Sequence, residues 1–371
     1  MKIINIKVQS LFSLYNYDIP LQSKGNVNII TGYNGMGKST ILKMLHCVFN
    51  QDWKVLESMP FAGLSIEWED HSLLSVTNQK GSSALNNSDQ QSLQQVYAQS
   101  KGILSFTYTN ASAQTYRDMN EMEFSLFISQ LKDLYIEDSR LGNPTKSLSI
   151  CGSGLADFIQ KTATAFGNSV AFADSVSEFT RSDFERECKK YEKNCKDLVR
   201  FDILDKGKVA IPQYGDNPVT NAVNYSSILR INKAYQEIEK SMSLLKLFDK
   251  LIVGSEYIDK KVFYSKTDGI LFKSTNSLGD IILLEQLSSG EKHKLMLYYD
   301  LVFNTSASTL VLMDEPEMSF HLAWQMTFLT EMERISKEKG FQMLMATHSP
   351  EIINGKWEIT YDLYKKAKKI N

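Results

Sequence analysis

Cysteine is scarce in this sequence, and its four cysteines are scattered. Cys47, Cys151, Cys188 and Cys195 form no CxxC pair and have no cluster of histidines beside them. This pattern argues against a structural zinc site and against a disulfide framework. We therefore expect the chain to work in a reducing, cytoplasmic environment.

Long hydrophobic runs are also missing. No stretch reaches the roughly 18 apolar residues of a membrane helix. At the N-terminus, Ile4, Ile6 and Val8 alternate with polar residues, a strand pattern that interrupts the continuous apolar core of a signal peptide. The sequence therefore predicts a protein that is neither secreted nor membrane-spanning.

Charge of one sign is not in excess either. Lys and Arg total 41 against 43 Asp and Glu, a formal net charge of −2. No global positive field indicates a nucleic-acid or membrane partner, so such a partner would need a local patch. The lysines between Lys189 and Arg200 could form a phosphate-binding stripe, but acidic residues interleave with them, which favours a solvated helix face.

What is present is a pattern typical of an α/β core with a helical insertion. Residues 1–150 combine a strand–loop–helix unit with short alternating runs that predict a small antiparallel sheet. Residues 151–255 have helical periodicity and an irregular piece that carries Pro212 and Pro218. Residues 256–371 return to strands and helices that close the core. We therefore expect a head in two parts, 1–150 and 256–371, with an insertion at 151–255.

A glycine-rich motif, GYNGMGKS, occupies residues 32–39. It fits GxxxxGK[ST] and lies between the predicted buried strand 27–31 and the predicted helix 40–49, as this phosphate-binding motif requires. Its backbone N–H groups and the helix start face the anion, Lys38 reaches the β- and γ-phosphates, and Ser39 ligates Mg²⁺. We predict that ATP and Mg²⁺ are bound by Asn34, Gly35, Met36, Gly37, Lys38, Ser39 and Thr40.

Two adjacent carboxylates, Asp314 and Glu315, follow the apolar run 309–313. This is the Walker B arrangement, in which the end of a strand projects both side chains into the nucleotide cleft. Asp314 is expected to hold Mg²⁺ and Glu315 to polarise the attacking water as general base. An exposed acidic turn after a strand is the alternative.

Residues 287–292, LSSGEK, resemble the ABC signature LSGGQ, with Ser289 in place of its first Gly and Glu291 in place of its Gln. The resemblance implies that Ser288 and Gly290 open a helix and bind the γ-phosphate held by the opposite protomer. A plain N-capped helix start is the alternative.

Residues 346–350, ATHSP, resemble the switch-histidine motif of ABC ATPases. The resemblance implies that His348 contacts the γ-phosphate and the attacking water, whereas a structural strand-end histidine is the alternative. The adenine contact is less marked in the sequence, and Phe12, Tyr15 and Tyr17 are its candidates.

The order of these four motifs resembles that of ABC-type ATPases, and the residues around Walker B narrow the group. Residues 314–321, DEPEMSFH, look like the DEPExxLH stretch of OLD, RecF and Septu-type heads, with Phe320 for Leu. Lys38 and Ser288 are 250 positions apart, as in SMC-like heads that carry an insertion. The resemblance implies an α/β ABC-type P-loop NTPase head: a mixed sheet flanked by helices, an N-terminal antiparallel β subdomain and a mostly helical insertion.

The function implied is that of an ATPase without an effector of its own. OLD-family nucleases append a TOPRIM domain, for which the 23 residues after His348 leave no room, and the insertion has no Glu followed by a DxD strand turn. The layout resembles the stand-alone ATPase subunits of bacterial anti-phage systems such as Septu, PARIS and some retrons. We therefore expect a homodimer or higher oligomer that closes around ATP and regulates a separate nuclease or toxin.

Two other functions remain open at the level of sequence. A RecF-like recombination or repair ATPase would bind DNA with an affinity that depends strongly on ATP and salt. A transporter ATPase would require a membrane partner and a Q-loop glutamine that is not evident here.

Overall fold

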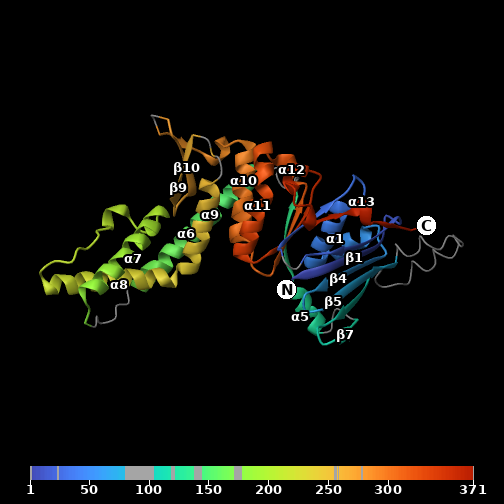
Figure 1. The fold of residues 1–371 in the computed structure, drawn as a ribbon, viewed down its shortest axis with the longest axis horizontal. Helices are drawn as coiled ribbons and strands as arrows, with labels where there is room; N and C mark the ends of the chain where they lie inside the picture. Colours follow the sequence, from blue (N-terminus) through green and yellow to red (C-terminus); the bar gives the residue numbers. More distant parts are fainter. Residues whose placement is uncertain are drawn as a thin grey trace. The chain divides into compact units, whose positions relative to one another are not determined.

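The protein is described from a computed structural model (Figure 1). The structure describes residues 2–22, 25–79, 104–117, 122–137, 144–170, 178–254, 257, 259–276 and 279–370. The chain divides into two compact units: Met1–Gly142 with Asn304–Asn371, and Asn143–Phe303. The segment expected as an insertion, 151–255, therefore belongs to the same unit as the segment that carries Ser288.

A parallel sheet of five strands forms one layer of the first unit. Its order is β14-β3-β13-β12-β8, and every neighbouring pair is parallel. Both faces of such a sheet are covered, so its strands are continuous apolar runs, and all five residues of β13 are buried. The strands are β3 Val27–Thr31, β8 Lys132–Glu137, β12 Thr309–Asp314, β13 Gln342–Ala346 and β14 Thr360–Asp362.

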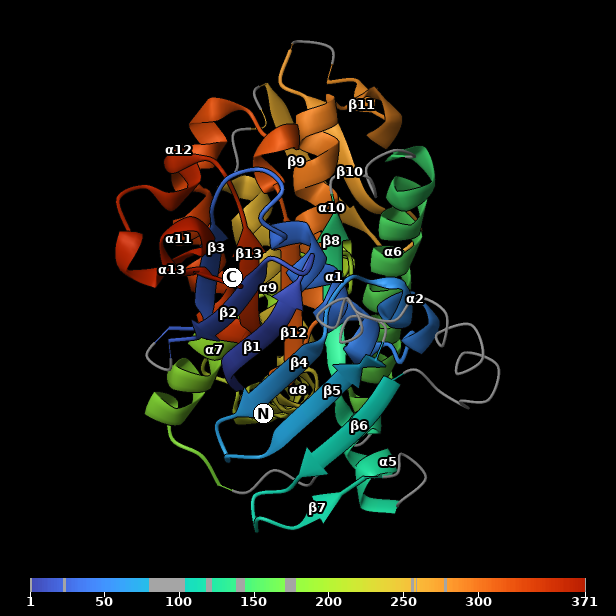
Figure 2. The same ribbon diagram turned by 90° about the vertical axis from the view of Figure 1, so that its right-hand side faces the viewer.

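An antiparallel sheet forms the second layer of this unit, in the order β15-β2-β1-β4-β5-β6-β7. Figure 2 shows β2, β1, β4, β5 and β6 side by side. Along β1, Ile6 and Val8 are buried and Lys7 between them is exposed, which is the predicted alternation. The strands are β1 Ile3–Leu11, β2 Tyr15–Pro20, β4 Gly63–Trp68, β5 Leu73–Asn78, β6 Leu104–Thr109, β7 Thr115–Tyr116 and β15 Lys368–Lys369.

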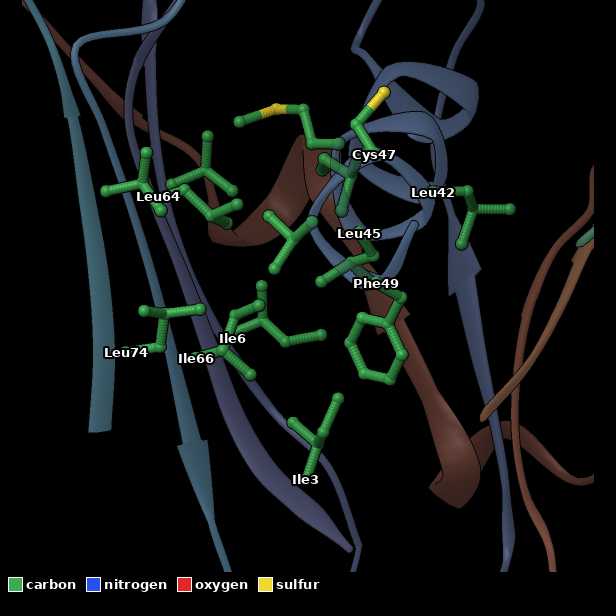
Figure 3. Packing of buried hydrophobic residues seen from close by; sticks show 14 of the residues in the cluster. Ile3, Ile6, Leu42, Leu45, Cys47, Phe49, Leu64, Ile66 and Leu74 are labelled. Carbon is green, nitrogen blue, oxygen red and sulfur yellow. The ribbon is translucent and has the colours of Figure 1, made fainter. Parts of the chain in front are cut away.

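Helix α1, Lys38–Phe49, packs against both sheets of the first unit. On one side it contacts β12, β13 and β8. On the other side Leu45 and Phe49 face Ile6 and Ile66 of the antiparallel sheet (Figure 3). The helix is thus held on two sides, which fixes the position of its N-terminal end. Among the described residues of this unit, the other helices are α2 Trp53–Ser58, α5 Met122–Gln130, η5 Pro316–Ser319, α11 Leu322–Lys339, α12 Pro350–Ile353, η6 Trp357–Ile359 and α13 Leu363–Lys366.

The second unit is mostly helical, with one small antiparallel sheet in the order β11-β10-β9. Phe184 and Tyr191 of α7 pack with Tyr225 and Ile228 of α8. The helices are α6 Pro144–Val170, α7 Arg181–Arg200, η3 Lys206–Lys208, α8 Pro218–Glu237, α9 Glu239–Val253, η4 Leu284–Gln286 and α10 Ser289–Phe303; the strands are β9 Lys260–Ser265, β10 Gly269–Ser274 and β11 Ile281–Ile282. The predicted fold class is confirmed, with its antiparallel β subdomain and helical insertion.

The charged face of α7 carries ion pairs. Lys190 lies 2.9 Å from Glu187, and Lys196 lies 2.7 Å from Glu192. These pairs agree with the interpretation of a solvated helix face. Within the ranges above, no helix is both long and apolar enough to cross a lipid bilayer.

Candidate nucleotide-binding site

The loop of residues 32–37 connects the end of β3 directly to the start of α1. Gly32, Gly35 and Gly37 have φ values of 144°, 81° and 90°, in a region that only glycine adopts without strain. A Cβ at Gly37 would also lie 2.4 Å from the side chain of Leu11 and 3.1 Å from the ring of Phe12. The backbone therefore has the conformation that the sequence motif requires, at the positive end of a helix.

The loop is supported from β2. The Tyr17 hydroxyl donates a hydrogen bond to Met36 O at 2.9 Å. Burial raises the pKa of Tyr17, and its side chain is 3% exposed. Tyr17, one of the three candidates for the adenine contact, thus uses its hydroxyl to hold the loop.

Lys38 is buried at the first position of α1, with 4% of its surface exposed. Its Nζ donates to Gly32 O at 3.2 Å and to Tyr33 O at 3.5 Å, and also contacts His348 Nε2. Burial lowers the pKa of Lys38, against the opposing effect of three nearby carboxylates. The carboxylates belong to Glu315, Asp314 and Glu317.

Ser39 and Asp314, the two residues expected to ligate Mg²⁺, are in contact. Ser39 Oγ donates to Asp314 Oδ1 at 3.0 Å, although the two residues are 275 positions apart. A hydroxyl and a carboxylate oxygen are ligands that Mg²⁺ accepts, and this ion usually keeps several waters and phosphate oxygens besides one or two carboxylates. The residues therefore fit a Mg²⁺ site completed by a nucleotide.

Glu315 follows β12 in a left-handed conformation, with φ 46° and ψ 55°. Such a conformation is costly for a residue with a Cβ and often marks a functional position. Its N–H donates to Ala346 O at 2.9 Å, and its Oε1 lies 3.5 Å from His348 Nε2. Because β12 and β13 are parallel, with Asp314 opposite Ala346, the residues that follow the two strands meet at one edge.

Glu317 was not among the predicted site residues, yet it links the segment that follows β12 to the loop that follows β13. Its Oε2 accepts a hydrogen bond from Thr347 Oγ1 at 2.8 Å, and its Oε1 accepts one from the backbone N–H of His348 at 2.7 Å. Gln325 adds a second link, since it donates to Glu317 O at 3.2 Å and accepts from Ser349 Oγ at 2.9 Å. The sequence signal for Glu317 was its place two residues after Glu315, where it is the third carboxylate of the segment.

Ser288 and Gly290 belong to the second unit, whereas the other predicted site residues belong to the first. Ser288 is exposed at the start of α10. Its Oγ accepts a hydrogen bond from Glu291 N at 3.3 Å, and its own N–H donates to Glu291 Oε2 at 2.8 Å. This is a capping box, so the N-capped helix start considered above is present; such an end also suits an anion.

Comparisons with known proteins place the sequence in a family. A family model described as "AAA domain, putative AbiEii toxin, Type IV TA system" matches residues 166–354, a range that includes Ser288, Asp314 and His348. No curated protein matches the chain.

Two solved structures of Smc heads are similar at 14% sequence identity. The Smc head domain of Pyrococcus furiosus, with an extended coiled coil and bound to the C-terminal domain of ScpA, gives a TM-score of 0.43 over 95% of this chain and 90% of that chain. The SmcHead bound to the C-winged helix domain of ScpA gives a TM-score of 0.42 over 95% of this chain and 91% of that chain.

Proposed function

Because the chain belongs to the AAA-domain family whose description names an AbiEii toxin and a type IV TA system, we propose that it is a cytoplasmic, Mg²⁺-dependent ATPase of a bacterial anti-phage system. It closes as a head-to-tail dimer around ATP and controls a separate effector, a nuclease or toxin. The observation that carries the ATPase assignment is the meeting of Lys38, Asp314, Glu315 and His348 at one edge of the parallel sheet.

Hydrolysis requires a positioned phosphate and a base for the attacking water. Lys38, at the start of α1, neutralises the β- and γ-phosphates after leaving its contacts with the loop carbonyls. Mg²⁺, held by Ser39 and Asp314, supplies charge neutralisation of the phosphate oxygens when bound. The Glu315 carboxylate then takes the proton of the water, and His348, 3.5 Å away, orients that carboxylate and the water.

The second half of each site comes from the partner protomer in this proposal. Ser288 and Gly290 are at an exposed helix start, where the backbone N–H groups and the helix dipole favour an anion. A Cβ built on Gly290 has no atom within 4 Å outside its own helix, so this helix start is open beside Gly290. The resemblance to the ABC signature supports a contact with the γ-phosphate of the opposite subunit.

Changing Glu315→Gln tests the assignment of the base. The amide cannot accept the proton, so we expect kcat to fall by about 10²-fold or more, while ATP binding is kept and the ATP-bound dimer accumulates. Steady-state ATPase assays, ATP titration and light scattering measure the three quantities. Glu338→Gln, at an exposed carboxylate of α11, is the matched control and should behave as wild type.

The same variant separates the ATPase from the defence role. In cells that also carry the neighbouring genes, the wild-type protein should reduce the number of phage plaques. The Glu315→Gln protein should not give the same reduction, because its effector is no longer controlled by ATP hydrolysis. Hydrolysis of ATP by Glu315→Gln at the wild-type rate would contradict the assignment of Glu315 as the general base. Plaquing that is unchanged by the wild-type protein across a phage panel would instead reject only the defence role.

A further inference from the structure

A negative charge lies beside the hydroxyl that is proposed to bind phosphate. Ser288 Oγ donates to Glu291 Oε2 at 2.9 Å, and Ser288 N–H donates to the same oxygen at 2.8 Å. The ABC signature has a neutral glutamine at this position, as noted above. A carboxylate so close to the phosphate-binding hydroxyl repels an incoming γ-phosphate unless its charge is compensated.

The compensating charge comes from β9. Lys260 Nζ donates to Glu291 Oε1 at 2.8 Å, and the two side chains are only 21% and 17% exposed. A pair that is largely removed from water is screened little by solvent and salt. Lys260 therefore acts on the opposite carboxylate oxygen from the one that Ser288 contacts.

Tyr257, which precedes β9 in the sequence, also holds the backbone of Glu291. It is 8% exposed and donates from its hydroxyl to Glu291 O at 3.1 Å. Burial by itself raises the pKa of Glu291, but the bonds from Lys260 and Ser288 outweigh burial and hold the pKa below its ordinary value. Glu291 thus remains an ionised carboxylate within a locally neutral pair.

We propose that Lys260 is a positioning residue of the ATPase. It neutralises and anchors Glu291, so that the Ser288 hydroxyl can turn from the carboxylate to the γ-phosphate of the opposite protomer. This role rests on the proposed function, since it requires that Ser288 acts on the partner's nucleotide. None of the sequence motifs includes Lys260.

A rescue experiment separates this role from simple structural support. Lys260→Met leaves Glu291 uncompensated, and ATPase activity is expected to fall roughly tenfold or more. In a Glu291→Gln background no negative charge is left for Lys260 to neutralise, and the amide NH₂ faces Lys260 once its oxygen accepts from Ser288, so Lys260→Met should not lower the activity further. Lys261→Met, at the exposed neighbouring position of β9, is the control and should leave activity unchanged.

Mixing experiments locate the defect in the signature half of the site. Lys260→Met keeps its own Lys38, so mixing it with Lys38→Ala should restore part of the activity, whereas mixing it with Ser288→Arg should not. Lys260→Gln and Lys260→Arg, with a polar and a charged side chain, serve if the methionine variant folds poorly; the arginine variant should retain most of the activity.

An equal loss from Lys260→Met in both backgrounds would overturn the proposal and leave the dimer model intact. So would failure of Lys260→Met to complement Lys38→Ala while Ser288→Arg does complement it. If neither Ser288→Arg nor Lys260→Met complements Lys38→Ala, the composite site itself is wrong, and the role of Lys260 falls with the proposed function.

Discussion

Single side chains decide how the end of β13 is held against the end of β12. The two oxygens of Glu317 each accept one bond from the loop after β13, from Thr347 Oγ1 and from the N–H of His348. Both donors are hydrogen-bonded to a carboxylate, which makes these bonds stronger than neutral ones. Glu317 therefore sets the position of His348 without needing to touch nucleotide.

Glu317→Gln is expected to lower kcat while leaving the KM for ATP nearly unchanged. A glutamine can accept only one of the two bonds, because its NH₂ group faces a donor on the other side. The loss of one charge-assisted bond, about 1.5–3 kcal/mol, corresponds to roughly a tenfold to hundredfold lower kcat if it acts wholly on the transition state. Steady-state kinetics measure the split between kcat and KM.

Glu351→Gln is the matched control for this variant. Glu351 lies in α12, directly after this loop, and accepts a hydrogen bond from Ser349 Oγ at 3.0 Å. It should change kcat little. An equal fall in kcat for both variants would indicate general loosening of the loop and reject a specific role of Glu317.

Some contacts of the site follow from the sequence, and others do not. The sequence assigns Ser39 and Asp314 to one Mg²⁺, and the structure brings them into contact because the phosphate loop and the acidic residue both follow strands that end at the same edge of a parallel sheet. The link from Glu317 to Thr347 and His348 was not foreseen, since its partners are 30 and 31 positions away. Periodicity gives the face on which a side chain lies, but not which distant donor it meets.

At the scale of elements, the turn between β9 and β10 depends on close approach to α6. Gly269 has φ 76°, and a Cβ there would lie 2.2 Å from Gly152 O and 3.0 Å from Ala156 N. Both atoms are backbone of α6, so they cannot yield as a flexible side chain can. The small sheet and this helix are thus packed with no room for a methyl group.

Gly269→Ala should destabilise the second unit by about 3 kcal/mol or more, because overpacking adds to the cost of a left-handed alanine. Gly279→Ala isolates the backbone term: Gly279 has φ 61°, and a Cβ there has no atom within 4 Å. This control should cost only about 1 kcal/mol. Urea unfolding followed by fluorescence measures both, and equal midpoints would show that α6 does not constrain the turn.

The sequence does not predict this close packing of Gly269 against α6. The strand-like alternation expected after residue 256 covers β9 and β10, since period-two burial is local information, but it did not separate the two strands or place the turn between them. Glycine is common in turns, so its presence there does not by itself indicate close packing. That Gly269 faces the backbone of a helix more than 100 positions earlier follows only from the three-dimensional path of the chain.

At the scale of the whole molecule, the predicted site residues fall into two sets. Lys38, Asp314, Glu315 and His348 belong to the first unit, and Ser288 belongs to the second. The sequence predicted both sets from their motifs, but a single chain cannot reveal from which copy the second set comes. The proposed dimer supplies it from the partner, and a mixing experiment tests that assignment directly.

Lys38→Ala and Ser288→Arg should each be inactive alone and regain activity together. A dimer of one chain of each kind has one site with two defects and one site with none. With random pairing in a two-fold dimer, half of the dimers are mixed, so an equimolar mixture should recover about a quarter of wild-type ATPase activity. Activity is measured across mixing ratios, with a maximum expected at equal amounts.

Lys38→Ala mixed with Glu315→Gln is the control that makes the result specific. Both changes affect the same half of the composite site, so each site of the mixed dimer keeps one defect and no activity should return. Recovery in this control would show exchange or contamination rather than complementation. Absence of recovery with Ser288→Arg, once mixed dimers have been detected by mass, would mean that Ser288 does not act across the interface and that each chain completes its own site or uses another partner.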